Sequence, residues 1–144
     1  MNRTEFETLR DLQNKVIRGD IVFSRREQTK PFLIAEAWIE NTSGYDVRLN
    51  IRYNIEVESK TFAVDVRGVG PICRLDVDGH NHPPVGRHHK HALQTEKCAN
   101  RNLPDGVTDY SHLAGQSLRA CFAEFCRLGG ISHEGQLNAP DEGM

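Results

Sequence analysis

The chain has 144 residues, a length typical of one domain, and a domain of this size folds without a framework of disulfides. Its 18 lysines and arginines against 20 aspartates and glutamates give a formal net charge of -2, which excludes the global cationic field of many nucleic-acid binders. No apolar run approaches the roughly 20 residues that cross a bilayer, and the first residues lack the layout of a signal peptide. We therefore expect a cytoplasmic protein without a membrane partner, in which any anion-binding site is local.

The first predicted element is a helix over residues 4–18. Thr4 and Glu7 have capping-box spacing, an apolar stripe of helical periodicity follows them, and Gly19 supplies a stop. Residues 32–39 are then rich in apolar and aromatic side chains and end at a turn cluster, which predicts a strand entering a hairpin. Trp38 is in phase with an isoleucine of this strand, so we expect it in the core.

Three further strands are predicted between residues 47 and 78. Residues 47–57 alternate strictly between apolar and polar side chains, and the same alternation recurs in 61–67 and 73–78. Short connections between these strands favour an antiparallel meander, because parallel pairing needs long crossovers. One face of the sheet should then be polar and partly cationic. Its expected members are Arg48, Asn50, Arg52, Asn54, Arg67, Arg74 and Asp76.

The C-terminal part of the chain predicts a long loop and a second helix. Residues 97–109 are polar and rich in turn formers, whereas residues 114–128 hold an apolar stripe with Asp109 or Ser111 as the N-cap. We expect an α+β fold, an antiparallel β-meander of four to five strands with an N-terminal and a C-terminal helix packed on one face. Residues 1–133 would form the single domain, and residues 134–144 a flexible C-terminal tail.

Five of the seven histidines lie in one short segment, the most biased stretch of the chain. Strand periodicity projects His80 and His82 to the same side of one extended segment, and His89 and His91 to the same side of another. A Pro-Pro-Val-Gly turn between the two segments can reverse the chain. The two pairs would then face each other. If the preceding strand keeps its phase, Asp76 lies on the same polar face as the first pair.

The leading functional hypothesis is binding of RNA or another phosphate-bearing ligand on the open sheet face, with metal-independent ribonuclease chemistry of a toxin or defence type. Two histidines that titrate near neutral pH can exchange a proton pair across a phosphodiester while a cation stabilises the developing charge. The candidate acid–base pair is His82 and His91, with Asp76 orienting one imidazole, and no cofactor is needed. The candidate phosphate contacts are Arg74, Arg87 and Lys90.

The local charge around the histidines supports an anionic ligand. Residues 67–91 carry four lysines and arginines (+4) and two aspartates (-2), so the segment has a charge of +2 with neutral histidines, against -2 for the whole chain.

Two other hypotheses stay open. In the first, His80, His82, His89 and His91 bind zinc or another transition metal, because neutral imidazole is the commonest protein ligand for such metals. The segment completes no zinc-enzyme signature. In the second, the protein is a non-enzymatic, phage or antitoxin-like interaction protein that recognises a protein partner through an exposed strand edge and the loop 97–109.

The four cysteines divide into two groups. Cys73, Cys121 and Cys126 lie at apolar positions of predicted elements, so we expect them in the core. Cys98 adjoins the histidines in a polar loop, where it is a candidate fourth metal ligand or nucleophile beside the alternative of an ordinary loop cysteine.

Four segments follow one another in a recognisable order: Phe62–Arg67, Arg74–Val77, the turn His80-Asn81-His82 and the histidines of 88–91. In this order the chain resembles a small bacterial protein family of unknown function that is associated with prophages and toxin–antitoxin genes. The resemblance covers residues 62–91 closely, implies a short cytoplasmic protein and favours the RNA hypothesis. The chain departs from the family in its shorter turn at 83–86, where relatives carry an Asn-Pro-Asp-Gly type of loop.

Overall fold

The computed structural model describes residues 3–25, 27–78, 89–92, 107–109 and 111–142. These residues form a mixed α+β fold with helices α1 (Arg3–Asp11) and α2 (Leu118–Gly129) and short 3-10 turns at Glu27–Thr29 and Ser111–Leu113. The strands are β1 (Lys15–Arg18), β2 (Ile21–Val22), β3 (Ser24–Arg25), β4 (Phe32–Trp38), β5 (Val47–Asn54), β6 (Lys60–Val66), β7 (Gly70–Val77), β8 (His89–Ala92), β9 (Val107–Asp109), β10 (Ile131–Glu134) and β11 (Leu137–Asn138).

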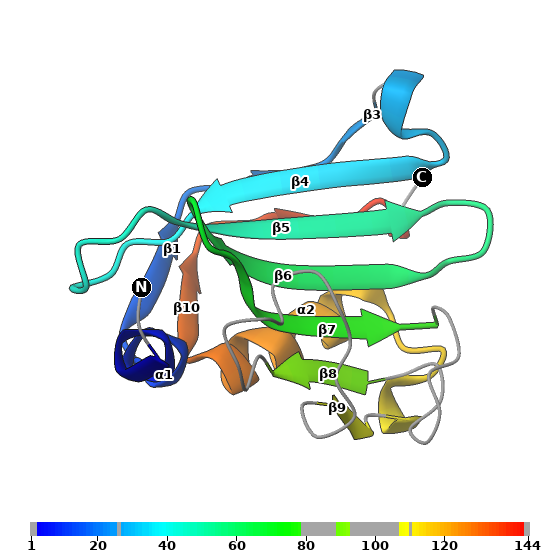
Figure 1. Ribbon diagram of the computed structural model, residues 1–144. Coiled ribbons are helices and arrows are strands. Elements are labelled where there is room, and N and C mark those ends of the chain that lie inside the picture. The colour runs from blue at the N-terminus through cyan, green and yellow to red at the C-terminus, as the bar shows by residue number, and fades with distance from the viewer. Residues whose placement is uncertain (1–2, 26, 79–88, 93–106, 110, 143–144) are drawn as a thin grey trace.

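The main sheet is an antiparallel meander, as the sequence predicts. Within the described residues it has seven strands in the order β3-β4-β5-β6-β7-β8-β9, and each strand pairs with the next along the chain (Figure 1). The four central strands, β4 to β7, coincide with the predicted ones. The sheet is wider than the expected four to five strands because the short strands β3, β8 and β9 extend its two edges.

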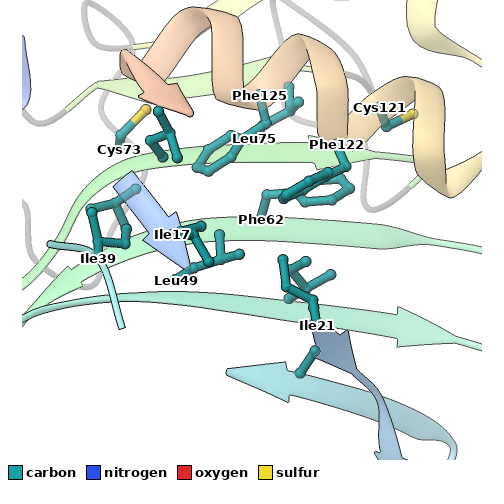
Figure 2. Packing of buried hydrophobic residues seen from close by; sticks show 14 of the residues in the cluster. Ile17, Ile21, Ile39, Leu49, Phe62, Cys73, Leu75, Cys121, Phe122 and Phe125 are labelled. Carbon is teal, nitrogen blue, oxygen red and sulfur yellow. The ribbon is translucent and has the colours of Figure 1, made fainter. Parts of the chain in front are cut away.

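A second layer covers one face of this sheet. It consists of α2 and two parallel strand pairs, β1 with β10 and β2 with β11, which join the N-terminal part of the chain to its C-terminal part. Figure 2 shows Ile17 and Ile21 from this layer pointing toward the sheet, and Phe62 of β6 lying beside two phenylalanines of α2. The ring centroids of Phe62 and Phe125 are 5.6 Å apart, and burial of such apolar surface is the main stabilising term of the fold.

The predicted helix over 4–18 is wrong in its second half, because α1 ends at Asp11 and residues 15–18 form β1. Val16 and Ile17 are β-branched, which suits an extended backbone, and pairing with β10 outweighs the helical periodicity. The buried ammonium of Lys15 donates hydrogen bonds to the carbonyls of Leu9, at 3.2 Å, and Arg10, at 2.9 Å. Lys15 therefore donates to carbonyls at the end of α1, where the Leu9 carbonyl also accepts from the Leu12 N–H.

The second helix begins later than predicted. Its N-cap is Ser117, whose side chain accepts a hydrogen bond from the Ala120 N–H at 3.1 Å, whereas Ser111 begins a separate 3-10 turn. The helix ends at Gly130, which adopts a left-handed φ of 65°.

The predicted flexible tail is also corrected, because residues 134–142 are part of the fold. Leu137 pairs with Ile21 of β2 and is buried, as is Ala139. This return of the chain depends on Gly135, which has a φ of 153° and passes so close to Gly19 that a Cβ atom would lie 2.2 Å from the Gly19 carbonyl oxygen.

Candidate functional site

The face of the main sheet opposite α2 is built from every second residue of the central strands, and we call it the open face. In an antiparallel pair, directly opposed residues share a face, so the register defines its membership. Arg52 is opposite Thr61 and Thr61 is opposite Asp76. The members on the central strands are Phe32, Ile34, Glu36, Trp38, Arg48, Asn50, Arg52, Asn54, Thr61, Ala63, Asp65, Arg74 and Asp76.

A hydrogen-bonded cluster lies on this face where β6 meets β7. Asp76 is only 5% exposed, and its Oδ1 accepts hydrogen bonds from the Thr61 hydroxyl at 2.8 Å and from the Arg74 Nε at 3.2 Å. The Arg74 side chain is 41% exposed, so its guanidinium also meets solvent. Two residues of one strand, Arg74 and Asp76, thus form an ion pair that fixes a buried carboxylate beside an accessible cation, as their shared phase predicts.

Strand β8 brings two of the candidate histidines beside this cluster. Its register places His91 opposite Arg74 and His89 opposite Asp76. Strand β9 then places Asp109 opposite His89. A six-residue row therefore crosses the sheet through Ile34, Arg52, Thr61, Asp76, His89 and Asp109.

The other candidate residues either have a strand position out of phase with this cluster or lie outside the described residues. Lys90 is opposite Leu75, a core residue, so its strand position is out of phase with Arg74. His80, His82, Arg87 and Cys98 lie outside the described residues, and with them the proposed facing of the two histidine pairs. In the described part of the chain no group of three or more His, Cys, Asp or Glu side chains is placed to hold a metal.

Asp65 is a carboxylate of the open face whose environment is unfavourable for charge. Burial raises the pKa of Asp65, the nearby Glu36 raises it further, and the opposing attraction of Arg74 does not cancel these effects. Asp65 lies opposite Arg48 across β5 and β6. Two arginines of the open face therefore lie next to carboxylates that are shielded from solvent. Arg48 is opposite the half-buried Asp65, and Arg74 is paired with the buried Asp76.

The aromatic part of the open face is not evident from the sequence pattern. Trp38 was expected in the core, but its side chain is 59% exposed because it lies opposite Arg48 and not on the covered face. The Arg48 guanidinium lies over the indole ring, 4.1 Å from its centroid, and the Arg52 guanidinium lies 4.4 Å from the centroid of Phe32. Apart from Glu36, residues 32–38 are apolar on both faces, so only the pairing with the alternating strand β5 reveals their phase.

The described cysteines are core residues, as predicted. Cys73 and Cys121 are buried and Cys126 is half-buried, and none of the three forms a disulfide. Burial raises the pKa of the Cys121 thiol to about 11 and that of the Cys126 thiol to about 12. Neither thiol is therefore an activated nucleophile at neutral pH.

Comparisons with protein-family models, with curated proteins and with solved structures found no match to this chain. Among the helices of the described segments, none is long and apolar enough to cross a membrane.

Proposed function

We propose that the protein binds RNA or another phosphate-bearing ligand on the open face, with the β6–β8 cluster as the phosphate site. The observation that carries the proposal is the register of β7 and β8, in which His91 is opposite Arg74 and His89 is opposite Asp76. A guanidinium held by a buried carboxylate is a fixed donor for phosphate oxygens. The proposal keeps Arg74, Asp76 and His91 from the sequence analysis and adds His89 and Thr61.

The same arrangement suits metal-independent cleavage of RNA. One imidazole would take the proton of a ribose 2′-hydroxyl as it attacks the phosphorus, and the other, protonated, would give a proton to the departing 5′ oxygen. Arg74 would stabilise the negative charge of the pentacoordinate phosphorus. Asp76 would orient the imidazole beside it, as a buried carboxylate does for a histidine base. His82 and Arg87 remain candidates from the sequence, and Lys90 is omitted because its strand position is opposite the core residue Leu75.

The direct test is a binding and cleavage assay with a single-stranded RNA, run without added metal and in the presence of a chelator. We expect Arg74→Ala to weaken binding and the double variant His89→Ala/His91→Ala to abolish turnover. The controls are Arg127→Ala, an exposed arginine on α2, and His112→Ala, an exposed histidine. Both controls should behave as the wild type. Unchanged binding in Arg74→Ala at an unchanged melting temperature would contradict the proposal.

A second candidate function, binding of a transition metal, is favoured by one specific observation. His89 and His91 are two residues apart on β8, and His89 lies between Asp76 and Asp109 on the neighbouring strands. Histidine and aspartate are the residue types that hold many zinc and iron ions, and here they occupy neighbouring register positions at one edge of the sheet. Elemental analysis of tag-free protein separates the two functions: one equivalent of metal in the wild type and none in His89→Ala/His91→Ala would establish the metal site.

The proposal includes a cytoplasmic location. The three described cysteines form no disulfide, which suits a reducing compartment. Measuring the distribution of the native protein between cell fractions tests it.

A further inference from the structure

Strands β4 and β5 carry two aromatic–arginine pairs next to the proposed phosphate site. The Arg48 guanidinium covers one side of the Trp38 indole at 4.1 Å, and the Arg52 guanidinium covers the Phe32 ring at 4.4 Å. Trp38 nevertheless keeps 59% of its surface exposed, which is unusual for the largest apolar side chain of a chain. When an arginine packs against one side of an exposed aromatic ring, it fixes the orientation of that ring. Another planar group can then stack on the ring.

The charges around Trp38 favour an anionic partner. Arg48 and Arg67 share the carboxylate of Asp46, at 3.3 Å and 3.9 Å. The Asp46 side chain is only 22% exposed, whereas those of Arg48 and Arg67 are 45% and 82% exposed. The carboxylate therefore lies beneath the cations, and the surface that a ligand meets is dominated by guanidinium groups. Glu36 is the exposed acidic residue of β4 on this face.

The aromatic pairs and the phosphate site lie on the same face of the main sheet. The register runs from Glu36 through Asn50 and Ala63 to Arg74, across four neighbouring strands. At about 4.8 Å between strands, β4 and β7 are about 14 Å apart. A short stretch of extended RNA spans such a distance, so one strand can reach the Trp38 and Arg74 positions together.

We infer that the β4–β5 half of the open face is a stacking platform for the bases of single-stranded RNA, with Trp38 as the principal stacking residue. This inference rests on the proposed function and adds the substrate class to it. Stacking on aromatic rings and arginine planes is the common means of binding single strands, because every base has a planar face. Bases inside a duplex are already stacked on one another, so a duplex cannot use the platform.

The test uses the intrinsic fluorescence of Trp38, since the chain contains one tryptophan. We expect a single-stranded oligonucleotide to quench this fluorescence, and an abasic sugar–phosphate chain or a duplex of the same length to leave it unchanged. In parallel, anisotropy of a labelled single strand should show that Trp38→Ala weakens binding by about 5- to 150-fold, the factor carried by one base–aromatic stack. Trp38→Phe should lose less affinity than Trp38→Ala, because it keeps an aromatic ring. The matched control is Val22→Ala, which removes an equally exposed apolar side chain outside the sheet face and should have no effect.

The two proposals fail in different ways. Wild-type affinity in Trp38→Ala together with weakened binding in Arg74→Ala would overturn the stacking platform and leave the phosphate site standing. Equal quenching by the duplex or by the abasic chain would also overturn the platform. If neither the single strand nor the abasic chain binds the wild-type protein at low salt, both proposals are wrong.

Discussion

Asp65 is the residue at which burial and charge conflict most clearly. Its pKa in the folded state is raised above that of an unfolded chain, first by burial and then by Glu36, while Arg74 acts in the opposite direction. A carboxyl group with a raised folded pKa costs stability at a pH above that pKa, and the cost disappears as the pH falls below the unfolded value. The charged form of Asp65 therefore destabilises the fold at neutral pH.

The first prediction follows from this sign. Asp65→Asn should melt at a higher temperature than the wild type at neutral pH. The difference should shrink as the pH falls through the raised pKa of Asp65 and vanish below the ordinary aspartate pKa. Thermal melts followed by circular dichroism over a pH series measure it. An Asn variant that is equally or less stable at neutral pH would show that the Arg74 attraction outweighs burial.

The described cysteines give a second prediction. Because burial raises the thiol pKa values of Cys121 and Cys126 to about 11 and about 12, almost no thiolate exists at pH 7. In a Cys98→Ser background we expect a thiol reagent to label the native protein slowly and the denatured protein at all three remaining cysteines. Rapid labelling of any of them under native conditions would contradict their assignment to the core.

At the residue scale, the sequence correctly predicts which side chains are buried on strictly alternating strands. It does not predict burial on strand β4. Tyr53 occupies an apolar position of the alternation in residues 47–57 and is 5% exposed, as that alternation predicts, whereas Trp38 is exposed and not in the core. The difference is that β5 alternates and β4 does not, so only tertiary pairing sets the phase of β4. The buried Lys15 and Lys60 were also missed, because their ammonium groups bind backbone carbonyls and leave no sequence motif.

At the scale of elements, the end of α2 depends on Gly130. Its left-handed φ of 65° suits glycine, and a Cβ atom there would lie 2.6 Å from the Leu12 carbonyl oxygen. We therefore predict that Gly130→Ala destabilises the protein more than Gly115→Ala does. Gly115 has a similar φ of 71° but nothing within 4 Å of an added Cβ, so it carries only the conformational cost.

Chemical denaturation of the two glycine variants measures how much more stability Gly130→Ala loses than Gly115→Ala. This difference is the cost of the clash between the added Cβ atom and the segment after α1. Equal loss of stability in both would mean that the Leu12 segment moves aside at no cost.

The short strands explain why element prediction was incomplete. Strands β1, β2, β10 and β11 have two to four residues each, too few to carry a periodic signal. They exist because the two ends of the chain pair with each other in parallel, a relation that local sequence does not express. The longer strands β5 to β7 have seven or eight residues each, and they were predicted from the alternation in residues 47–57, 61–67 and 73–78.

At the scale of the whole molecule, pairing of the N-terminal with the C-terminal strands closes the fold around one core. Leu137 of β11 is 4% exposed and lies beside Ile21, which is fully buried, in the same cluster as the residues of the main sheet. We predict that Leu137→Ala destabilises the entire fold by about 2–5 kcal/mol, the usual range for a buried leucine.

Unfolding followed by Trp38 fluorescence, which reports on the main sheet, and by far-UV circular dichroism should give coincident transitions in the wild type and in Leu137→Ala. Val22→Ala, an exposed position on the same strand pair, should change little. A Leu137→Ala protein in which the Trp38 transition is unmoved would show that the strand pair folds independently of the sheet.

The candidate site was partly predictable for the same reason as the fold. Alternation correctly assigned Arg48, Arg52, Arg74 and Asp76 to one polar face. Which histidines lie beside them depends on the pairing of β8, and this pairing favours His89 and His91 at the cluster while setting Lys90 out of phase. The positions His80, His82 and Arg87 remain sequence predictions.

The central claim is that the open face is the ligand-binding face, and NMR of the protein titrated with a single-stranded RNA tests it most directly. The side-chain N–H signals of Trp38, Arg48, Arg52 and Arg74 report on this face, and that of Arg119 on α2 reports on the opposite layer. We predict saturable shifts in the first four signals and none in the last. Shifts centred on α2 and β10, or no shifts at saturating RNA, would contradict the claim.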